Sequence, residues 1–159
     1  MKKYFWIITC CVAALDQAIK AGIRKMPVHT VFYEIPGVFA LTHSVNTGAA
    51  FSLFSGRPIL LAVVSAVLLA MIYRYVCRKM HLTGAAWMSF ACLLGGGIGN
   101  LFDRVFFSGV TDYIVLQFVD FPIFNLADMA ITGSVGVLLL LLLTNTLEKD
   151  SEGGHESDY

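Results

Sequence analysis

Charged residues are scarce in this chain. They make up 14% of its 159 residues, whereas soluble domains carry about 25%. Hydrophobic residues make up 57%, and the mean hydropathy is +0.74. A chain this short and this apolar has too little polar surface to cover a soluble core, so the composition excludes a soluble domain. The net charge is zero, which gives no reason to expect a nucleic-acid partner.

Metal-site and cofactor patterns are also missing from the sequence. The four cysteines, at positions 10, 11, 77 and 92, lie in apolar runs and have no CxxC or Cys/His ligand spacing. The histidines, at positions 29, 43, 81 and 155, lack ligand spacing as well. The glycine-rich stretch at 95–100 is not followed by Gly-Lys-Ser/Thr, so it is not a phosphate-binding loop. We therefore expect neither a metal ion nor a cofactor.

Long apolar runs dominate the chain instead. A membrane-spanning helix needs roughly 20 apolar residues, and four runs approach this length, at 4–22, 59–76, 84–102 and 124–143. The first run follows two lysines, as in a signal peptide, but no small-x-small cleavage site is evident, so we expect a retained helix. The sequence predicts an all-α membrane protein with four transmembrane helices, forming one domain over 1–147. An acidic tail at 148–159 is expected to be disordered.

Two longer connections, at 24–58 and 103–123, lie on the same side of the membrane. Residues 38–46 partly alternate apolar and polar side chains, which predicts a strand in a small β-sheet on the membrane surface. A cytoplasmic N-terminus places six basic residues inside and five outside, and the short loop after the second helix, with three basic residues, favours this orientation. Both termini are then cytoplasmic, and the sheet lies at the outer face.

Acidic residues beside membrane spans are costly and usually functional, so each one needs an explanation. Asp16 precedes Lys20 by four residues, which is the spacing of an ion pair on one helix face. Asp103 adjoins Arg104, and we expect it to be an ionised structural acid that ties the end of the third helix to its neighbours. The acids at positions 34 and 120 are ordinary loop acids.

Asp112 and Asp128 remain without an evident partner. Asp112 has no basic residue within seven positions, and Asp128, about one turn into the fourth helix, has none until Lys149. Two carboxylates that approach closely share a proton, as in aspartic proteases, where one acid activates water and the other protonates the substrate. The apolar inner half of the fourth helix, at 135–143, favours chemistry at the membrane surface. A proton or cation path through a small transporter, or a structural assembly role, stays open.

Small and polar residues near these acids predict further contacts. The turn at 46–52 follows the predicted strand and is suited to present backbone groups to an extended peptide. Gly95 and Gly99 have the small-xxx-small spacing that lets membrane helices pack closely. We expect Asn100 and Asn125 to make hydrogen bonds that position neighbouring acids.

Five motifs together resemble those of the bacterial lipoprotein signal peptidases, also called signal peptidase II. In chain order they are DQAIK at 16–20, NTGAAFS at 46–52, GGIGNLFDR at 96–104, VTDY at 110–113 and FNLAD at 124–128. The resemblance implies an aspartic endopeptidase of the bacterial inner membrane, with a small sheet and an active site near the outer, periplasmic face. Such enzymes remove the signal peptide from prolipoproteins before a cysteine that carries a diacylglyceryl group.

Carried over residue by residue, the resemblance implies a catalytic dyad of Asp112 and Asp128. The positions implied to bind substrate or support the dyad are Asp16, Lys20, Asn46, Gly48, Asn100, Asp103, Arg104 and Asn125. Many members have Ser or Thr after the second catalytic aspartate, where this chain has Met129, so no role for a hydroxyl carries over there. The implied partners are diacylglyceryl-modified prolipoproteins and membrane lipid, with no nucleic acid, and we expect a monomer.

Overall fold

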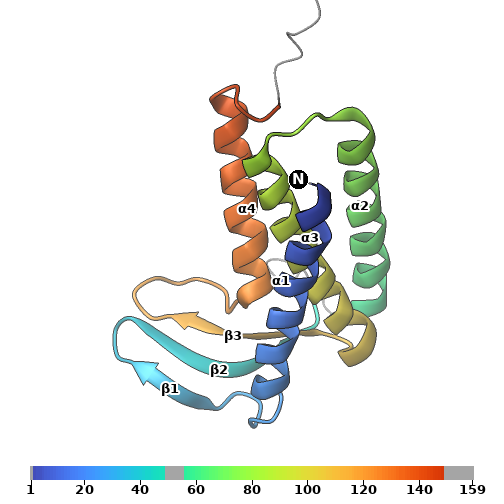
Figure 1. Ribbon diagram of the computed structural model, residues 1–159. Coiled ribbons are helices and arrows are strands. Elements are labelled where there is room, and N and C mark those ends of the chain that lie inside the picture. Colours follow the sequence, from blue (N-terminus) through green and yellow to red (C-terminus); the bar gives the residue numbers. More distant parts are fainter. Residues whose placement is uncertain (1, 49–55, 149–159) are drawn as a thin grey trace, which may run out of the picture.

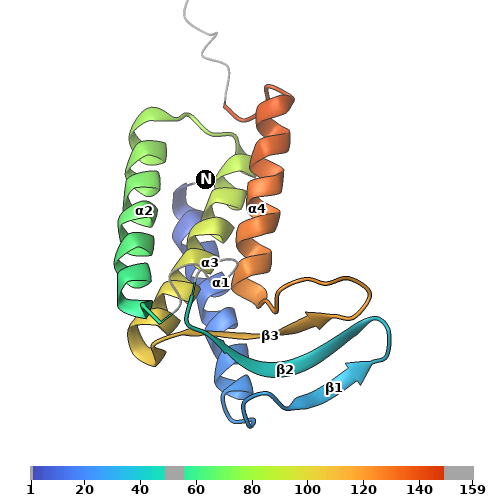
Figure 2. The same cartoon turned by 180° about the vertical axis from the view of Figure 1, so that it is seen from behind.

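Four long helices form the body of the protein. The computed structural model describes residues 2–48 and 56–148. The helices are α1 (Lys2–Ile23), α2 (Pro58–Lys79), α3 (Gly84–Phe107) and α4 (Leu126–Leu143). Each is long and apolar enough to cross a membrane, so the four predicted spans are confirmed. They stand side by side with a sheet at one end and the first helix's N-terminus at the other (Figure 1), and Figure 2 shows the same arrangement from behind.

Helix α3 packs against each of the other three helices. Its glycines allow α1 to approach very closely. A Cβ at Gly95 would lie 2.7 Å from the carbonyl oxygen of Thr9, and one at Gly99 would lie 2.5 Å from a carboxylate oxygen of Asp16. Side-chain carbons do not approach other atoms this closely, so the predicted small-residue packing of Gly95 and Gly99 is confirmed.

Aromatic residues hold the bundle together at the end remote from the sheet. Phe5 of α1 packs edge-on against Trp87 of α3, with ring centroids 5.4 Å apart, and beside Phe90 at 5.6 Å. Tyr73 of α2 lies 6.1 Å from the same Phe5 ring. Phe5, Trp87 and Phe90 are buried, so this cluster joins α1 to α3 and brings α2 against both.

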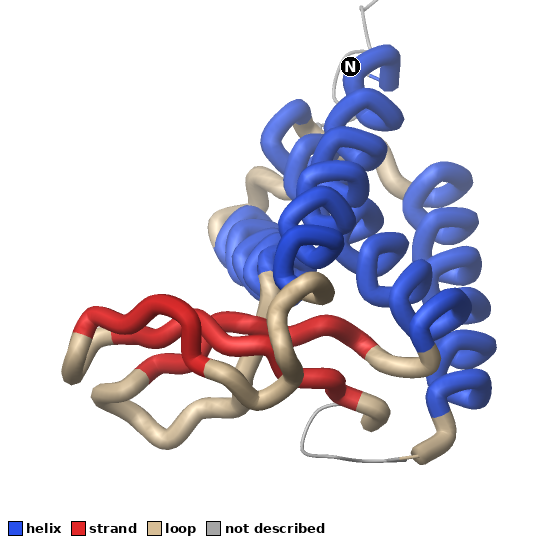
Figure 3. The backbone as a smooth tube through the Cα atoms, turned by 90° about the horizontal axis from the view of Figure 1, so that it is seen from below, coloured by secondary structure: helices blue, strands red, loops and turns tan. Residues whose placement is uncertain are grey.

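A three-stranded antiparallel sheet lies at the other end of the bundle. Its strands are β1 (Val31–Ile35), β2 (Phe39–Asn46) and β3 (Val110–Leu116), in the order β1-β2-β3. Viewed from that end, the sheet extends to one side of the helices (Figure 3). The strand predicted at 38–46 is confirmed as β2, whereas β1 and β3 were not predicted. The first four residues of β3 are all buried, so they show no alternation of apolar and polar residues.

Two predicted helix boundaries were wrong. Helix α3 continues to Phe107 instead of ending at 102, because the carboxylate of Asp103 is buried inside the protein and can remain within the helix without contact to water. Helix α4 begins at Leu126 instead of 124, because Asn125 adopts an extended backbone and caps it. The predicted tail beyond Glu148 and the predicted turn at 49–52 lie outside the described residues.

Candidate active site

Asp112 lies on β3, opposite Ser44 of β2. Asn46 is its diagonal neighbour across the strand pair, which is within reach of a side-chain contact. The amide nitrogen of Asn46 donates to Asp112 Oδ2 at 3.1 Å. The amide oxygen of Asn46 accepts from the backbone N–H of buried Gly48 at 3.0 Å. The hydrogen bond from Gly48 therefore fixes the orientation of the Asn46 amide, so that the amide N–H group of Asn46 faces Asp112.

Asp128 is the third residue of α4 and belongs to the cap of that helix. Its backbone N–H donates to Asn125 Oδ1 at 2.9 Å, and its Oδ2 accepts from the backbone N–H of Asn125 at 3.2 Å. This reciprocal pair is a capping box. The prediction that Asp128 lacks a structural partner, a full turn inside the helix, was therefore wrong. The helix N-terminus also favours a negative charge at this position.

Asn125 and Asn100 connect the two acids. The amide nitrogen of Asn125 donates to Asp112 Oδ1 at 2.6 Å and to Asn100 Oδ1 at 3.2 Å. The amide nitrogen of Asn100 in turn donates to Asp128 Oδ1 at 2.7 Å. The hydrogen bonds predicted for Asn100 and Asn125 are thus confirmed. Asp112 from the sheet and Asp128 from α4 meet in one hydrogen-bonded group although they lie on different elements.

Burial changes the acidity of Asp112, which is only 3% exposed. Burial is the largest cause that raises its pKa from 3.8 to about 7, and the charge of Asp128 raises it further, against hydrogen bonds from Asn46 and Asn125. A carboxyl group whose pKa lies near neutral pH is suited to give and take protons during catalysis. The charge of Asp128 reaches Asp112 because Asn125 donates hydrogen bonds to both acids.

Asp16 and Lys20 form the predicted ion pair on α1. Their Oδ2 and Nζ atoms lie 2.8 Å apart, and both side chains are fully buried. Lys20 also lies 3.3 Å from Asp103 Oδ2 and donates to Asn100 Oδ1 at 2.9 Å. Because lysine can only donate hydrogen bonds, it holds the oxygen of Asn100 toward itself. The amide N–H of Asn100 is then directed at Asp128.

Asp103 ties α3 to α1 and β3, as predicted, but the guanidinium that pairs with it is not that of Arg104. Arg24 Nη1 lies 3.2 Å from Asp103 Oδ1, and Gln17 donates to the same oxygen at 2.9 Å. The backbone N–H of Thr111 donates to Asp103 Oδ2 at 2.9 Å. Sequence reasoning missed Arg24 and Gln17 as members of this cluster. Arg24 follows the Asp16–Lys20 pair by a further four residues on the same helix face, and this spacing was the available signal.

Arg104 lies at the end of α3 within electrostatic range of Asp128 and Asp112. Its Nη1 donates to the backbone oxygen of Asn100 at 3.2 Å. Its Nε is buried and has no hydrogen-bond partner within the described part of the protein. An unsatisfied buried donor is costly, and this one is suited to bind a carbonyl oxygen of a ligand near the two acids. Met129, the residue after Asp128, is half exposed.

Residues 2–48 and 56–148 contain no group of three or more His, Cys, Asp or Glu side chains arranged to hold a metal ion.

The sequence pattern of the signal peptidase (SPase) II family matches residues 8–144. The chain belongs to the signal peptidase II family. This family consists of peptidases, so the polar groups at the sheet end of the bundle belong to a multi-pass bacterial membrane peptidase.

Individual relatives of this chain match along almost their whole length. A lipoprotein signal peptidase of Streptococcus thermophilus is 36% identical over 142 residues, which cover 89% of this chain and 90% of that protein. One of Caldicellulosiruptor bescii is 35% identical over 152 residues, covering 96% and 94%. One of Lactobacillus johnsonii is 40% identical over 147 residues, covering 92% and 95%.

A solved structure of a bacterial membrane enzyme is similar to this chain in its overall fold. That structure, obtained by the in meso method at 2.3 Å resolution, has a TM-score of 0.83 and 26% sequence identity, covering 98% of this chain and 95% of that one. A second bacterial membrane enzyme, solved at 1.9 Å, has a TM-score of 0.80 and 28% identity, covering 91% and 95%.

Proposed function

We propose that this protein is an aspartic endopeptidase that removes the signal peptide of prolipoproteins just before a diacylglyceryl-modified cysteine. The observation that carries the proposal is the pair of carboxylates, Asp112 and Asp128, linked through Asn125, with the pKa of Asp112 raised to about 7. The relatives named above are lipoprotein signal peptidases, which supports the substrate class. A peptidase family also disfavours the alternative of a proton or cation transporter.

The two acids differ in ways that suit opposite roles. Asp112 is buried, and its pKa of about 7 lets it hold a proton near neutral pH, whereas Asp128 accepts hydrogen bonds from Asn100 and from the backbone N–H of Asn125 at the start of α4. Asp128 takes a proton from a water molecule as the water oxygen bonds to the scissile carbonyl carbon, and Asp112 gives its proton to the carbonyl oxygen. As the C–N bond breaks, Asp128 passes its proton to the leaving nitrogen and Asp112 recovers one from the tetrahedral intermediate. Both acids return to their starting states.

The surrounding residues position the substrate and the acids. Arg104 Nε, which is buried without a partner among the described residues, donates to a substrate carbonyl oxygen. Asn46 and Gly48, at the end of β2, hold Asp112 from the sheet side. The ion cluster of Asp16, Lys20 and Asp103 supports Asn100 from the α1 side.

The position of the acids suits a substrate that is anchored in the bilayer. Asp112 lies on the sheet and Asp128 in the first turn of α4, so both lie at the end of the spans where the sheet begins. A diacylglyceryl group in the outer leaflet would bring the peptide bond that precedes the modified cysteine to this depth. In our proposal the sheet faces the periplasm, both termini face the cytoplasm, and the enzyme acts as a monomer that needs no metal ion, cofactor or nucleic acid.

The test uses purified full-length protein, a diacylglyceryl-modified prolipoprotein and the same prolipoprotein without its lipid. Asp112→Asn and Asp128→Asn each keep the side-chain shape but remove the proton chemistry, and we expect each to lower kcat by at least about a thousandfold. Asp120→Asn changes an exposed loop acid and serves as the matched control with unchanged kcat.

Cleavage at the wild-type rate by either dyad variant would refute the dyad. Equal cleavage of the lipid-free prolipoprotein would refute recognition of the modified cysteine. A wild-type protein that cuts neither substrate would refute the peptidase proposal itself.

A further inference from the structure

The start of α4 carries four backbone N–H groups that have no partner within the helix, as at the start of any helix. In chain order they belong to Asn125, Leu126, Ala127 and Asp128. Three of them donate to carboxylate or amide oxygens of residues in the candidate site, namely Asp128, Asp16 and Asn125. The fourth, that of Leu126, donates to the hydroxyl oxygen of Tyr113 at 3.1 Å. Tyr113 is therefore the one acceptor in this set that has no role in the proposed function.

Tyr113 directly follows Asp112 on β3 and is only 5% exposed. A buried tyrosine usually finds a partner for its hydroxyl group, and here that partner is the first turn of α4. Asp112 accepts from the side chain of Asn125 at 2.6 Å, so two successive residues of β3 hold two successive residues at the start of α4. The phenol is thus a second link between the strand that carries Asp112 and the helix that carries Asp128, and this link does not pass through an asparagine amide.

Backbone hydrogen bonds bring the two segments together just before the helix begins. The N–H groups of Tyr113 and Ile114 both donate to the carbonyl oxygen of Phe124, at 3.0 and 2.8 Å, and the N–H of Phe124 donates to the carbonyl oxygen of Ile114 at 3.1 Å. These bonds do not involve the Tyr113 hydroxyl, so they remain when it is removed. The hydroxyl acts two residues further along, on the helix itself and two positions before Asp128.

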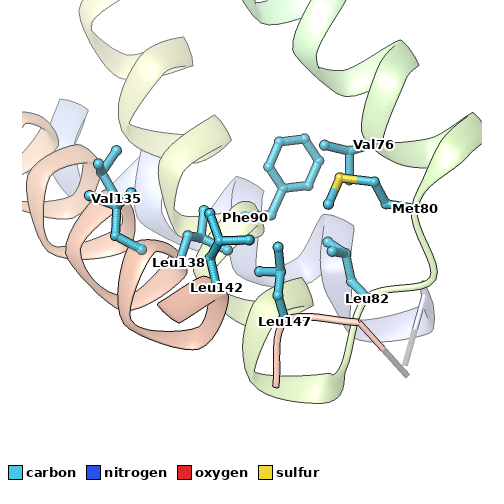
Figure 4. Close-up of a pocket in the computed structure, with 9 residues that line it drawn as sticks. Val76, Met80, Leu82, Phe90, Val135, Leu138, Leu142 and Leu147 are labelled. Atoms are coloured by element: carbon cyan, nitrogen blue, oxygen red, sulfur yellow. The ribbon is translucent and has the colours of Figure 1, made fainter. Parts of the chain in front are cut away.

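Apolar side chains hold α4 at its other end. Figure 4 shows Val135, Leu138 and Leu142 of α4 around Phe90 of α3, and these residues line an apolar groove. Apolar contacts are non-directional, so they restrain the turning of α4 about its own axis less than hydrogen bonds do. The direction in which Asp128 faces therefore depends on the hydrogen bonds of the first turn.

Tyr113 stays in its neutral form near neutral pH. Burial raises its pKa above the ordinary value of about 10, and the charges of Asp16, Asp128 and Asp112 raise it too, against the hydrogen bond from Leu126. These three carboxyl groups come from α1, α4 and β3, so the hydroxyl lies within electrostatic range of acids on every side of the site. Because the phenol keeps its proton, it adds no step of its own to a pH profile around neutrality.

From these contacts we infer that Tyr113 is a positioning residue, whose hydroxyl holds the first turn of α4 to β3 and thereby keeps Asp128 within range of Asp112. It acts through Asp128 and not on the substrate. The inference rests on the proposed function, because it takes these two acids as the catalytic pair.

The first experiment measures hydrogen exchange at Leu126 in Tyr113→Phe, which keeps the ring and removes only the hydroxyl. Asparagine is followed by leucine twice in the chain, at 100–101 and 125–126, so isotopic labelling of asparagine carbonyl carbons and leucine nitrogens selects two amide signals. Leu101 lies inside α3 and is the internal reference. We expect exchange at Leu126 to become about fivefold faster, the factor for one ordinary hydrogen bond, with Leu101 unchanged. Equal exchange at Leu126 in wild type and variant overturns the inference.

The second experiment measures cleavage of the diacylglyceryl-modified prolipoprotein against pH. Small misplacements of a catalytic group slow the reaction, so we expect kcat of Tyr113→Phe to fall about fivefold with KM unchanged. The charge of Asp128 raises the pKa of Asp112, whereas that of Lys20 lowers it. A displaced Asp128 raises this pKa less, so the alkaline limb of the kcat profile should move to lower pH.

Thr9→Val is the matched control for a loss of stability alone. The Thr9 hydroxyl is also buried and donates to the carbonyl oxygen of Ala91 at 3.2 Å, about 10 Å along α1 from Asp16. Removing it should lower the melting temperature about as much as Tyr113→Phe does. We expect kcat, its pH profile and the exchange at Leu126 to stay as in the wild type.

A wild-type kcat and pH profile for Tyr113→Phe, or the same losses in both variants, overturn the inference. If the wild-type protein cleaves no prolipoprotein, the proposed function fails instead. The exchange at Leu126 then still decides whether the Tyr113 hydroxyl holds the start of α4.

Discussion

Lys20→Met would remove the cation from the centre of the buried ion cluster. Lys20 contacts Asp16 at 2.8 Å, Asp103 at 3.3 Å and Asn100 at 2.9 Å, and its side chain is fully buried. Methionine fills most of the same volume but supplies neither charge nor hydrogen-bond donor. Asp103 keeps the guanidinium of Arg24, whereas Asp16 keeps only neutral donors.

The expected loss of stability follows from the carboxylate that is left without a cation. Removing one partner of a buried ion pair costs about 3–5 kcal/mol, because the other charge stays buried without compensation. For Lys20→Met this charge is on Asp16, which still accepts hydrogen bonds from Gln17 and from the backbone N–H of Ala127. We therefore expect the free energy of unfolding to fall by about 3 kcal/mol, the lower end of this range.

The assay monitors unfolding of the purified protein in mixed micelles by circular dichroism. It compares the wild type, Lys20→Met, Asp16→Asn and the double variant Asp16→Asn/Lys20→Met. In the pair no carboxylate at position 16 is left uncompensated, so we expect it to be less destabilised than the sum of the single variants by about 1–3 kcal/mol. A loss below about 1 kcal/mol for Lys20→Met, as at a solvated surface pair, would refute the reasoning. Strict additivity in the double variant would refute it too.

Two further predictions concern the acid pair and the helix packing. The pKa of Asp112 is raised from 3.8 to about 7 in the folded protein, so the contribution of this group to stability is complete below pH 3.8 and is lost as the pH rises through 7. The difference in unfolding free energy between wild type and Asp112→Asn should therefore vary with pH across this window, and a constant difference would contradict the raised pKa. Gly99→Ala places a Cβ 2.5 Å from Asp16 Oδ2 and should lower the melting temperature, whereas Gly133→Ala, whose added Cβ meets no neighbouring element within 4 Å, should leave it equal or slightly higher because alanine favours helix. Equal effects of the two substitutions would show that the close contact of α1 with α3 is not required.

The four helices could be predicted because a membrane span appears in the sequence as one long run of consecutive apolar residues. The strand β3 could not be predicted in the same way. Its residues Val110 to Tyr113 are buried against neighbours from distant parts of the chain, and a strand buried on both faces shows no alternation. The extension of α3 depends on Arg24, which pairs with Asp103 across 79 positions, and no local pattern reports such a pair.

The candidate site shows the same division. Asp112 and Asp128 could be selected from the sequence because they lack nearby cations and match a family pattern. The capping role of Asp128 could also have been predicted from the nearby sequence, because Asn125 lies three residues before it at the start of an apolar run. That role was missed because the acids were sorted by charge partners alone. The link from Lys20 through Asn100 to Asp128 needs three helices in place, and it becomes visible only in the fold.

The fixed orientation of the asparagine amides determines what kind of inhibitor can bind these acids. Each of the four oxygens of Asp112 and Asp128 already accepts one N–H, from the side chains of Asn46, Asn125 and Asn100 and from the backbone of Asn125. The amide oxygens are held by other donors, so none is free to turn toward a guest. A compound that presents an uncharged alcohol beside these oxygens can donate to the remaining lone pairs. A compound that presents a carboxylate or sulfonate there adds a negative charge beside the two acids, so neutral alcohols are the better starting point for drug design against this enzyme.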